Sequence, residues 1–302
     1  MSSPLVPVTA AAVAAPERPT LKVESPGAEA LRMFLRNPSA IAGIVLLLIV
    51  VIVSIAGPWV LDADPFAISA APFTPPFSAG AWLGTDYLGR DVFTTLVYGG
   101  RATLLVGAFA AALSVLIGIT LGAFAGYYGG KVDAILMRIM EFFQVLPALL
   151  FAMVVVSLFT PTPVTVTIAI GIVIWPGTAR LTRAEFFRFR NLEFVRAERA
   201  IGAGNARIMW KVILPNALPP LIVSSALAIG GAILFAAGLS FLGLSDPNQM
   251  SWGLMIGASQ PYVLSCWWAV TFPGLAIFIT VLAISLIGDG LNDALNPKLR
   301  ER

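Results

Sequence analysis

Residues 102–130, ATLLVGAFAAALSVLIGITLGAFAGYYGG, form a run of 29 residues without a charged side chain. A helix needs about 20 predominantly apolar residues to cross the hydrocarbon core of a bilayer, where every backbone N–H and C=O must bond within its own segment. This run is long enough to cross and carries no charge that would need water. It therefore predicts a membrane-spanning helix and places the chain among membrane proteins.

Other charge-poor stretches repeat this pattern along the chain. Residues 37–61 are 25 uncharged residues with an apolar core over 41–61, and the 38-residue interval 142–179 is interrupted by TPTP at 160–163. Because proline breaks helices, this interval predicts two helices, 142–159 and 164–179, joined by a tight turn. Further spans are expected near 221–244 and 269–288. The expected fold class is an all-α membrane protein with six transmembrane helices.

The composition excludes most soluble catalytic designs. Only 12% of the 302 residues are charged, against about 25% in typical soluble domains, and 58% are apolar. The chain has no histidine, and its one cysteine, Cys266, is expected to be unpaired. This excludes histidine-based acid–base chemistry, Ser-His and Cys-His nucleophiles, the usual zinc sites and intramolecular disulfides. The net charge of +3 is too small to indicate nucleic-acid binding.

The sequence also predicts no catalytic, metal or nucleotide site near the spans. The acidic candidates, Glu141 and Asp289, lie at span ends, where solvation lowers the cost of charge, and we interpret both as structural or interface charges. The triplet Gly129-Gly130-Lys131 is followed by Val132 where a phosphate loop needs Ser or Thr to hold magnesium.

Positive charge predicts the orientation of the chain. If the N-terminus is cytoplasmic, 17 of the 19 Lys and Arg residues lie inside, 8 of them in the loop that follows the fourth span. Only Arg90 and Arg101 then lie outside. Because cytoplasmic loops carry the excess of Lys and Arg, both termini are expected to be cytoplasmic.

These boundaries divide the chain into five parts. Residues 1–37 are expected to be a partly disordered cytoplasmic leader, and 38–61 the first transmembrane helix. Residues 62–98, rich in proline and aromatic residues, predict an irregular extracytoplasmic lobe, interpreted either as an interfacial cap or as a docking surface. Residues 99–292 form a five-helix core with a cytoplasmic loop over 181–216, and 293–302 form a cytoplasmic tail.

The cytoplasmic loop has two predicted parts. Residues 183–201 contain neither Gly nor Pro and consist mainly of good helix formers, so they predict a helix in which Glu185 and Arg188 pair. After Gly202 and Gly204, Asn205 is expected to cap a short helix that Leu214-Pro215-Asn216 closes. That helix has an apolar stripe suited to a partner's groove, made of Ile208, Met209, Val212 and Ile213. The alternative is a basic amphipathic helix that lies on the inner leaflet.

Three smaller patterns concern packing. Trp267 and Trp268 are expected to anchor the last span at the headgroups. The glycines at 118, 122 and 126 form a small-residue ladder for close helix packing, which could involve a partner subunit. The polar residues within spans could line a path, but backbone bonding is favoured for most of them: Gln144, Ser224, Ser225, Ser240, Thr280 and Ser285.

The cytoplasmic loop resembles the EAA loop of permease subunits of bacterial ABC importers, which reads Glu-Ala-Ala, three residues, Gly, nine residues, Ile, any residue, Leu-Pro. The matching positions are Arg196-Ala197-Glu198, Gly202, Val212, Leu214 and Pro215, so the initial Glu and the second Ala are replaced. Gly84-Thr85-Asp86 with Leu88-Gly89-Arg90-Asp91-Val92 is similar to the signature of the C-type permease subunits of dipeptide, oligopeptide and nickel importers. Further similar stretches are Gly126-Tyr127-Tyr128-Gly129-Gly130 with Asp133, Thr271-Phe272-Pro273-Gly274, and Gly288-Asp289-Gly290-Leu291.

The resemblance implies a type I ABC importer permease (MetI-like) fold in a bacterial inner membrane, in the dipeptide branch of the family. It implies a heterodimer with a homologous permease, two cytosolic ATP-binding subunits and an extracytoplasmic peptide-binding protein. This chain itself would bind no cofactor, because the partners use ATP and magnesium. The implied ATPase-coupling residues are Arg196, Ala197, Glu198, Gly202, Asn205, Ile208, Met209, Val212, Leu214 and Pro215. A candidate docking site for the binding protein is Gly84, Thr85, Asp86, Gly89, Arg90 and Asp91.

Other functions remain open from the sequence. The same machinery could carry a nickel chelate, glutathione or an antimicrobial peptide. An ion-coupled transporter would need ionisable or broken-helix sites at mid-membrane, and the charge pattern shows none. A membrane enzyme would need a convincing pair of catalytic groups.

Overall fold

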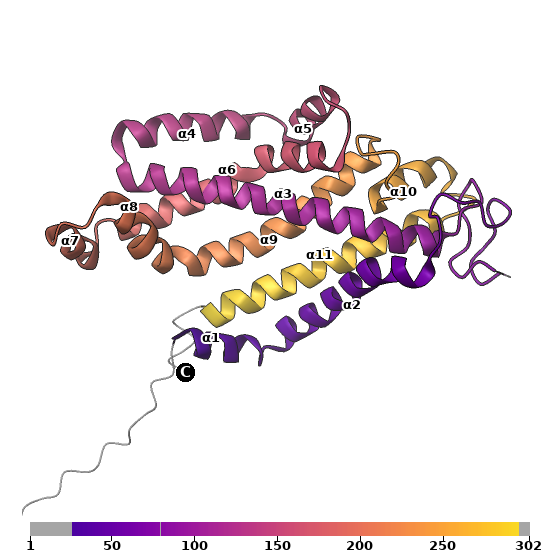
Figure 1. The fold of residues 1–302 in the computed structure, drawn as a ribbon, viewed down its shortest axis with the longest axis horizontal. Coiled ribbons are helices and arrows are strands. Elements are labelled where there is room, and N and C mark those ends of the chain that lie inside the picture. Colours follow the sequence, from indigo (N-terminus) through magenta and orange to yellow (C-terminus); the bar gives the residue numbers. More distant parts are fainter. Residues whose placement is uncertain (1–25, 79, 296–302) are drawn as a thin grey trace, which may run out of the picture.

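The computed structural model describes residues 26–78 and 80–295, and the regular secondary structure of this part of the chain is helical (Figure 1). The extended pairing within these residues is limited to three isolated bridges in the lobe after α2. The expected all-α class is confirmed. In chain order the elements are α1 Pro26–Phe34, α2 Pro38–Leu61, α3 Val92–Tyr128, α4 Gly130–Val145, α5 Ala148–Ser157, α6 Pro163–Phe189, α7 Glu193–Ala200, α8 Asn205–Arg207, the π-helix η1 Ile208–Ile213, α9 Leu214–Phe241, α10 Trp252–Ser259, the 3₁₀ turn η2 Gln260–Tyr262 and α11 Trp268–Leu295.

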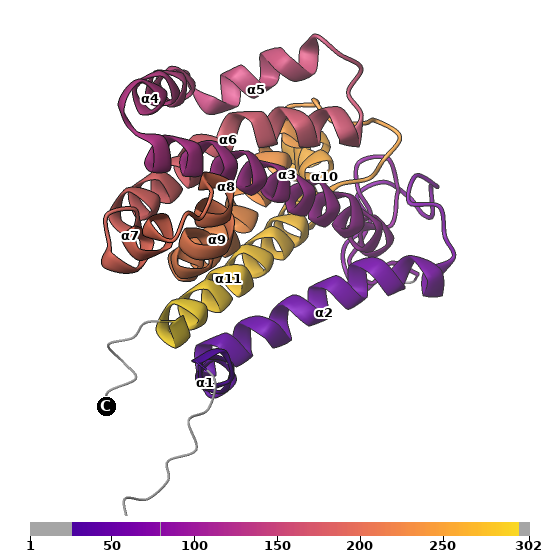
Figure 2. The same cartoon turned by 60° about the vertical axis from the view of Figure 1, so that its left-hand side comes forward.

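Five helices of the described chain are long and apolar enough to cross a membrane, with α8, η1 and α9 counted as one continuous helix over Asn205–Phe241. The long helices lie side by side, with α3 packed on α6 and α9, and α11 packed on α2 and α9 (Figures 1 and 2). Their mean hydropathies, 1.6 to 3.0, are high, which favours lipid over water around these helices.

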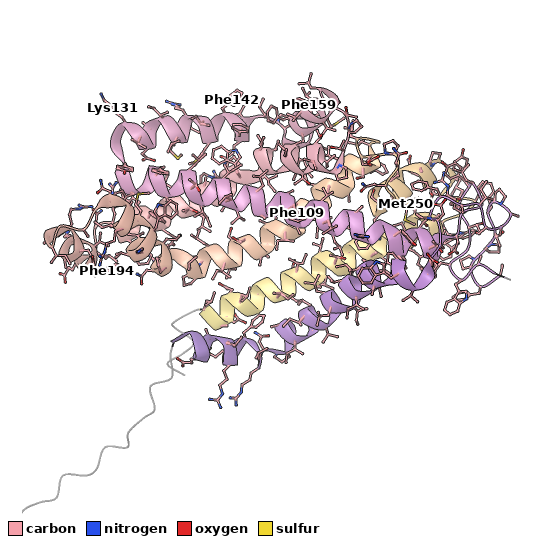
Figure 3. All side chains as sticks on the ribbon, viewed as in Figure 1. Phe109, Lys131, Phe142, Phe159, Phe194 and Met250 are labelled. Carbon is pink, nitrogen blue, oxygen red and sulfur yellow. The ribbon has the colours of Figure 1, made fainter. Side chains whose placement is uncertain are left out.

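The third predicted span is wrong as a single helix over 142–159. The chain instead forms α4 and α5, which meet at an angle of 88°, so the count is five spans, or six if this bent pair is one. The break falls at Leu146 and Pro147, where the backbone of Leu146 is extended. A residue before proline is driven away from the α-helical region, which ends α4. In Figure 3, Lys131 and Phe142 mark α4, and Phe159 lies beyond the bend.

Several predicted boundaries also move. The Asp91 side chain caps α3 by accepting from the Thr94 N–H at 2.8 Å, so residues 92–98 are helical rather than part of the lobe. Residues 26–34, assigned to the leader, form the helix α1. The rest of the leader, 1–25, and residues 296–302 of the tail lie outside the described residues.

The glycine ladder packs inside this chain. A Cβ atom on Gly122 would meet the carbonyl oxygen of Ala179, and one on Gly126 that of Arg183, both on α6. A Cβ on Gly118 would lie 2.6 Å from that of Thr178. These three positions let the α3 and α6 backbones approach each other closely, which holds the two helices together without a partner subunit.

Two of the six polar side chains named within the spans, Ser225 and Thr280, bond to their own backbone as expected. The Ser225 hydroxyl donates to the Leu221 carbonyl and the Thr280 hydroxyl to the Ala276 carbonyl, both at 2.7 Å. Such bonds satisfy a hydroxyl where lipid offers no partner.

Candidate coupling site

The segment after α6 turns sharply where the sequence predicts an unbroken helix. The Arg190 guanidinium donates through Nη1 to the carbonyl oxygens of Gly126 at 3.2 Å and Tyr127 at 3.3 Å, at the end of α3. The chain then breaks over residues 190–192 before α7 begins at Glu193. The predicted helix over 183–201 is therefore wrong at this point, because a tertiary bond to orphan carbonyls of α3 outweighs local helix propensity. Earlier in α6, the Glu185–Arg188 pair is confirmed at 3.1 Å.

The turn between α7 and α8 depends on Gly202. Its φ is +85°, and a Cβ there would meet nothing within 4 Å, so the requirement for glycine is one of backbone conformation alone. The Gly202 N–H donates to the Arg199 carbonyl at 3.1 Å, and the Ala203 N–H to the Glu198 carbonyl at 3.0 Å, which closes the end of α7. The turn leaves Ile201 76% exposed at its tip.

The sequence predicts that Asn205 caps α8, and this prediction is wrong. The N-cap is Gly204, and Asn205 is the first helical residue. Its Oδ1 accepts a hydrogen bond from the Tyr127 hydroxyl at 2.8 Å, which ties α8 to the end of α3. This contact links residues 78 positions apart, so sequence spacing alone could not reveal Tyr127 as part of the site.

The apolar stripe of the short helix faces the interior of this chain. Ile208, Met209 and Ile213 are at most 1% exposed and pack with Phe186 and Val195, while Val212 packs partly buried against the same cluster. They are not free to enter a partner's groove, contrary to the prediction. The surface facing outward is made instead of Arg196, Ala197, Arg199, Ala200, Ile201, Gly202, Asn205 and Arg207.

Pro215 does not close the short helix. The chain passes from α8 through the π-helix η1 into α9, and Pro215 sits in the first turn of α9. Proline lacks an N–H and its ring clashes with the preceding turn of an α-helix, and the wider π turn just before it provides room. The short helix and the span that follows it thus form one continuous helix over Asn205–Phe241.

The outward surface is basic. Glu198 is one of the two departures from the Glu-Ala-Ala pattern. Its Oε2 lies 3.7 Å from Nε of Arg207, and its side chain is only 29% exposed. Arg207 therefore neutralises the charge of Glu198 within the loop. Arg196 is exposed and forms no ion pair within the described residues. A cavity of about 380 Å³ beside this surface is lined by Tyr127, Tyr128, Arg190, Asn191, Arg199 and Asn205.

One ion pair behind this surface was missed by sequence reasoning. The Arg183 guanidinium forms a two-point contact with the Asp133 carboxylate, with Nη2 to Oδ2 at 2.6 Å, and joins α6 to α4. Their side chains are 30% and 17% exposed. The two residues are 50 positions apart in the sequence, and only their opposite charges indicated that they could pair.

The second predicted site lies in the lobe at the opposite end of the molecule from α7 (Figure 1). Thr85 is fully buried; its hydroxyl donates to the Ala71 carbonyl at 2.7 Å and accepts from the Thr74 N–H at 2.9 Å. The Asp86 carboxylate accepts from the N–H groups of Leu88 and Arg90, both at 2.8 Å.

The remaining lobe residues also hold its backbone. Gly84 and Gly89 have φ of +79° and +81°, and a Cβ on either would collide with a carbonyl oxygen. The Arg90 guanidinium lies over the Phe66 ring, 5.4 Å from its centroid. The motif of Gly84, Thr85, Asp86, Gly89, Arg90 and Asp91 therefore folds the lobe, and its role in docking stays a prediction.

Trp268 belongs to this network and not to the membrane interface. It is 6% exposed, and its Nε1–H donates to the Thr85 carbonyl at 2.9 Å, whereas its neighbour Trp267 is 53% exposed. The headgroup interpretation is wrong for Trp268 because the lobe covers it. The nearby thiol of Cys266 is buried and free, and burial raises its pKa.

The comparison with protein families identifies the class of protein. Residues 118–301 match the model described as "Binding-protein-dependent transport system inner membrane component", and residues 25–76 match "N-terminal TM domain of oligopeptide transport permease C". The first match covers more than half of the chain. The chain therefore belongs to the family of inner-membrane components of binding-protein-dependent transport systems, and it is a multi-pass protein of the inner membrane.

Within that family its curated relatives include DppC permeases. It is 39% identical over 289 residues to the "Di/tripeptide transport system permease protein DppC" of Pseudomonas aeruginosa, a match that covers 93% of this chain and 95% of the relative. It is also 39% identical to the "Dipeptide transport system permease protein DppC" of Alkalihalophilus pseudofirmus, over 91% of both chains, and to that of Bacillus subtilis, over 94% of this chain and 88% of the relative.

Solved structures confirm the expected fold. Two crystal forms of an inward-facing "MetNI methionine ABC transporter" match with a TM-score of 0.56 and 20% identity, over 67% of this chain and 96% of the other. This likeness confirms the MetI-like permease fold.

Proposed function

We propose that this chain forms one half of the membrane pathway of an ATP-driven importer of short peptides. The observation that carries the proposal is the 39% identity, over nearly the whole length, to permeases named for dipeptide and tripeptide transport. The other half would be a homologous permease, with two cytosolic ATPases and an extracytoplasmic binding protein. ATP and magnesium belong to the ATPases in this proposal.

The distribution of charge supports a cytoplasmic position for both ends of the chain. The basic loop around α7 lies at one end of the molecule and the lobe at the other (Figure 1). The Asn37 side chain donates to the Asp293 carboxylate at 3.0 Å, which joins the start of α2 to the end of α11. The first span therefore starts on the same side as the last span ends, and the positive-inside rule supports the cytoplasm as that side.

In the proposed mechanism an ATPase pushes on the exposed tip at Ile201 and Gly202. Because α8, η1 and α9 form one helix over Asn205–Phe241, a displacement of the tip moves this whole helix, including its membrane-spanning part. The Tyr127–Asn205 bond and the Arg190 bonds carry the same displacement to α3. Rigid helices that move together would switch the pathway between its two faces. In this mechanism the buried Ile208 and Met209 connect the short helix to the rest of this chain and do not contact the ATPase.

Purification and uptake together test this proposal. The tagged chain, expressed with its genomic neighbours, is expected to purify with a second permease and two ATPases, and to restore uptake of a radiolabelled dipeptide in cells that lack the transporter. Purification without any ATPase would overturn the importer assignment. Co-purification without dipeptide uptake would overturn only the substrate.

A further inference from the structure

A groove opens between the lobe and the outer half of α3. It has a volume of about 410 Å³, within the roughly 300–1,000 Å³ typical of small-molecule sites. Phe66, Leu105 and Met250 form apolar walls, and Arg101, Asn248 and Gln249 supply polar groups. Figure 3 marks this end of the molecule by Met250 and the coupling end by Phe194.

Arg101 is the charged group of this groove. The Tyr98 hydroxyl donates to the Pro58 carbonyl at 3.1 Å, which sets Tyr98 level with the last turn of α2. Arg101 follows three residues later, about 4.5 Å further along the helix toward the membrane centre. It forms no ion pair or hydrogen bond within the described residues. Arg101 is exposed and lies directly before the uncharged run 102–130, so its guanidinium is available to an anion at the edge of the membrane.

A second, much smaller cavity of about 30 Å³, enough for a water-sized group, adjoins the groove. The two share Ala102 and Gln249, and the smaller one adds Ser240, Ser245 and Asp246. One Asp246 oxygen accepts from the Asn248 N–H at 2.9 Å, and the carboxylate forms no ion pair within residues 26–78 and 80–295. The Ser245 hydroxyl is buried and has no hydrogen-bond partner there. Buried polar groups are normally bonded, so the Ser245 hydroxyl points to a polar ligand.

We propose that this groove and the small cavity beside it receive the transported peptide by its two charged ends, with Arg101 on the carboxylate and Asp246 on the ammonium group. The inference rests on the proposed function and adds a substrate site to it. A guanidinium matches a carboxylate with two parallel hydrogen bonds, and an aspartate accepts from an ammonium group. The apolar walls contact side chains without selecting among them. Recognition through the ends alone therefore lets peptides of different sequence pass.

The contrast with Arg90 separates this assignment from a structural role. Arg90, the other cation expected outside, lies over the Phe66 ring and belongs to the folded lobe. Arg101 has no such contact, although it projects from a regular helix that needs no side chain for its own stability. Its position is explained by a ligand and not by the fold.

The test uses the complete transporter in lipid nanodiscs, with Asn248→Cys as a reporter in a Cys266→Ala background. The rate at which a charged thiosulfonate labels the introduced thiol is measured with the dipeptide Ala-Ala, its C-terminal amide and its N-acetyl form at millimolar concentration. The dipeptide is expected to slow labelling about threefold or more, and each blocked form less. In Arg101→Gln the dipeptide and its amide should protect equally weakly, while Arg101→Lys retains part of the difference. In Asp246→Asn the dipeptide and the N-acetyl form should become equal.

Uptake driven by the binding protein supplies a second readout. Arg101→Gln is expected to lower the maximal rate of dipeptide uptake about tenfold, while Arg138→Gln, outside the groove, leaves it unchanged. Normal uptake by Arg101→Gln, or equal protection by all three ligands, would overturn the site. A loss of uptake with unchanged protection would assign Arg101 to a lipid phosphate or to the partner permease, and would also overturn it. If the unaltered transporter takes up no dipeptide, the dipeptide substrate of the proposed function fails instead.

Discussion

The lobe and the coupling loop carry the two stretches of family-like sequence, and they use those residues in opposite ways. In the lobe, Thr85 is fully buried and the Asp86 carboxylate bonds to backbone N–H groups. In the coupling loop, Arg196 and Gly202 face outward. A motif of similar strength in the sequence therefore marks a folding element at one end of the molecule and a surface at the other.

The secondary structure explains the difference. Within its described residues the lobe has neither a helix nor a named strand between α2 and α3, so several of its backbone groups bond to side chains such as Thr85 and Asp86. The coupling loop is helical and satisfies its backbone internally, which leaves its side chains free for other molecules. Substitutions in the lobe should thus reduce stability, and substitutions in the coupling loop should reduce transport.

The largest loss of stability is expected from Gly84→Val. The positive φ costs a non-glycine residue about 1–2 kcal/mol, and a Cβ 2.7 Å from the Thr74 oxygen and from Trp268 Nε1 adds about 1–3 kcal/mol of overpacking. The measurement is the thermal unfolding and the folded yield of the purified complex. Gly80→Val is the matched control, because Gly80 has a φ of +87° but open space around it. Equal losses of stability in both variants would show that the collision at Gly84, and with it the dense packing of the lobe, does not affect the stability of the complex.

The next largest effect is expected from Asp133→Asn, at the other end of the molecule. It leaves the Arg183 guanidinium, 30% exposed, without its anion, and we expect a loss of about 2 kcal/mol, below the value for a fully buried pair. Glu141→Gln, which breaks the 85% and 51% exposed pair with Arg138, should change stability little. Unfolding of the two variants in detergent measures the difference. If both change stability equally, the Asp133–Arg183 contact is an ordinary surface pair.

The sequence predicts the spans well because their signal is local. Apolar runs without charge identify α2, α3, α6, α9 and α11, and the TPTP break before α6 is correct. The bend at Pro147 was missed because the uncharged run begins at Phe142, near the end of α4, and continues past the bend through α5, so hydropathy did not reveal where α4 ends.

The candidate site was predicted less well, because its contacts are long-range. The spacing of Ile208, Met209 and Ile213 correctly gives one apolar face, but spacing does not say whether that face meets a partner or the chain's own core. Arg190 and Tyr127 act across 63 and 78 positions, and no local pattern carries that information. Trp268 was assigned to the interface because the fold of the lobe above it has no periodic signal in the sequence.

A smaller effect on stability, with a large effect on transport, is expected from Gly202→Val. The φ of +85° makes valine cost about 1–2 kcal/mol, but the turn is exposed and can relax locally. We expect folded protein in the membrane with dipeptide uptake lowered about tenfold, since the substitution displaces the tip that we propose as the ATPase contact. Gly202→Asn is the control, because asparagine tolerates the left-handed conformation and should retain most uptake. Normal uptake by Gly202→Val would contradict the coupling role of this turn.

The smallest effect is expected from Tyr127→Phe, which removes the hydroxyl bonded to Asn205 at 2.8 Å. A neutral hydrogen bond contributes about 1 kcal/mol net, and because Asn205 is exposed, water replaces much of the lost bond. The loss in unfolding free energy should thus lie below that of Gly202→Val, while uptake falls severalfold, since α8 is no longer tied to α3. A double-mutant cycle with Asn205→Ala isolates the bond, because the second substitution should cost nothing further once the first is made. Additive losses in uptake would mean that α3 and α8 move independently, and the displacement would then reach the membrane through α9 alone.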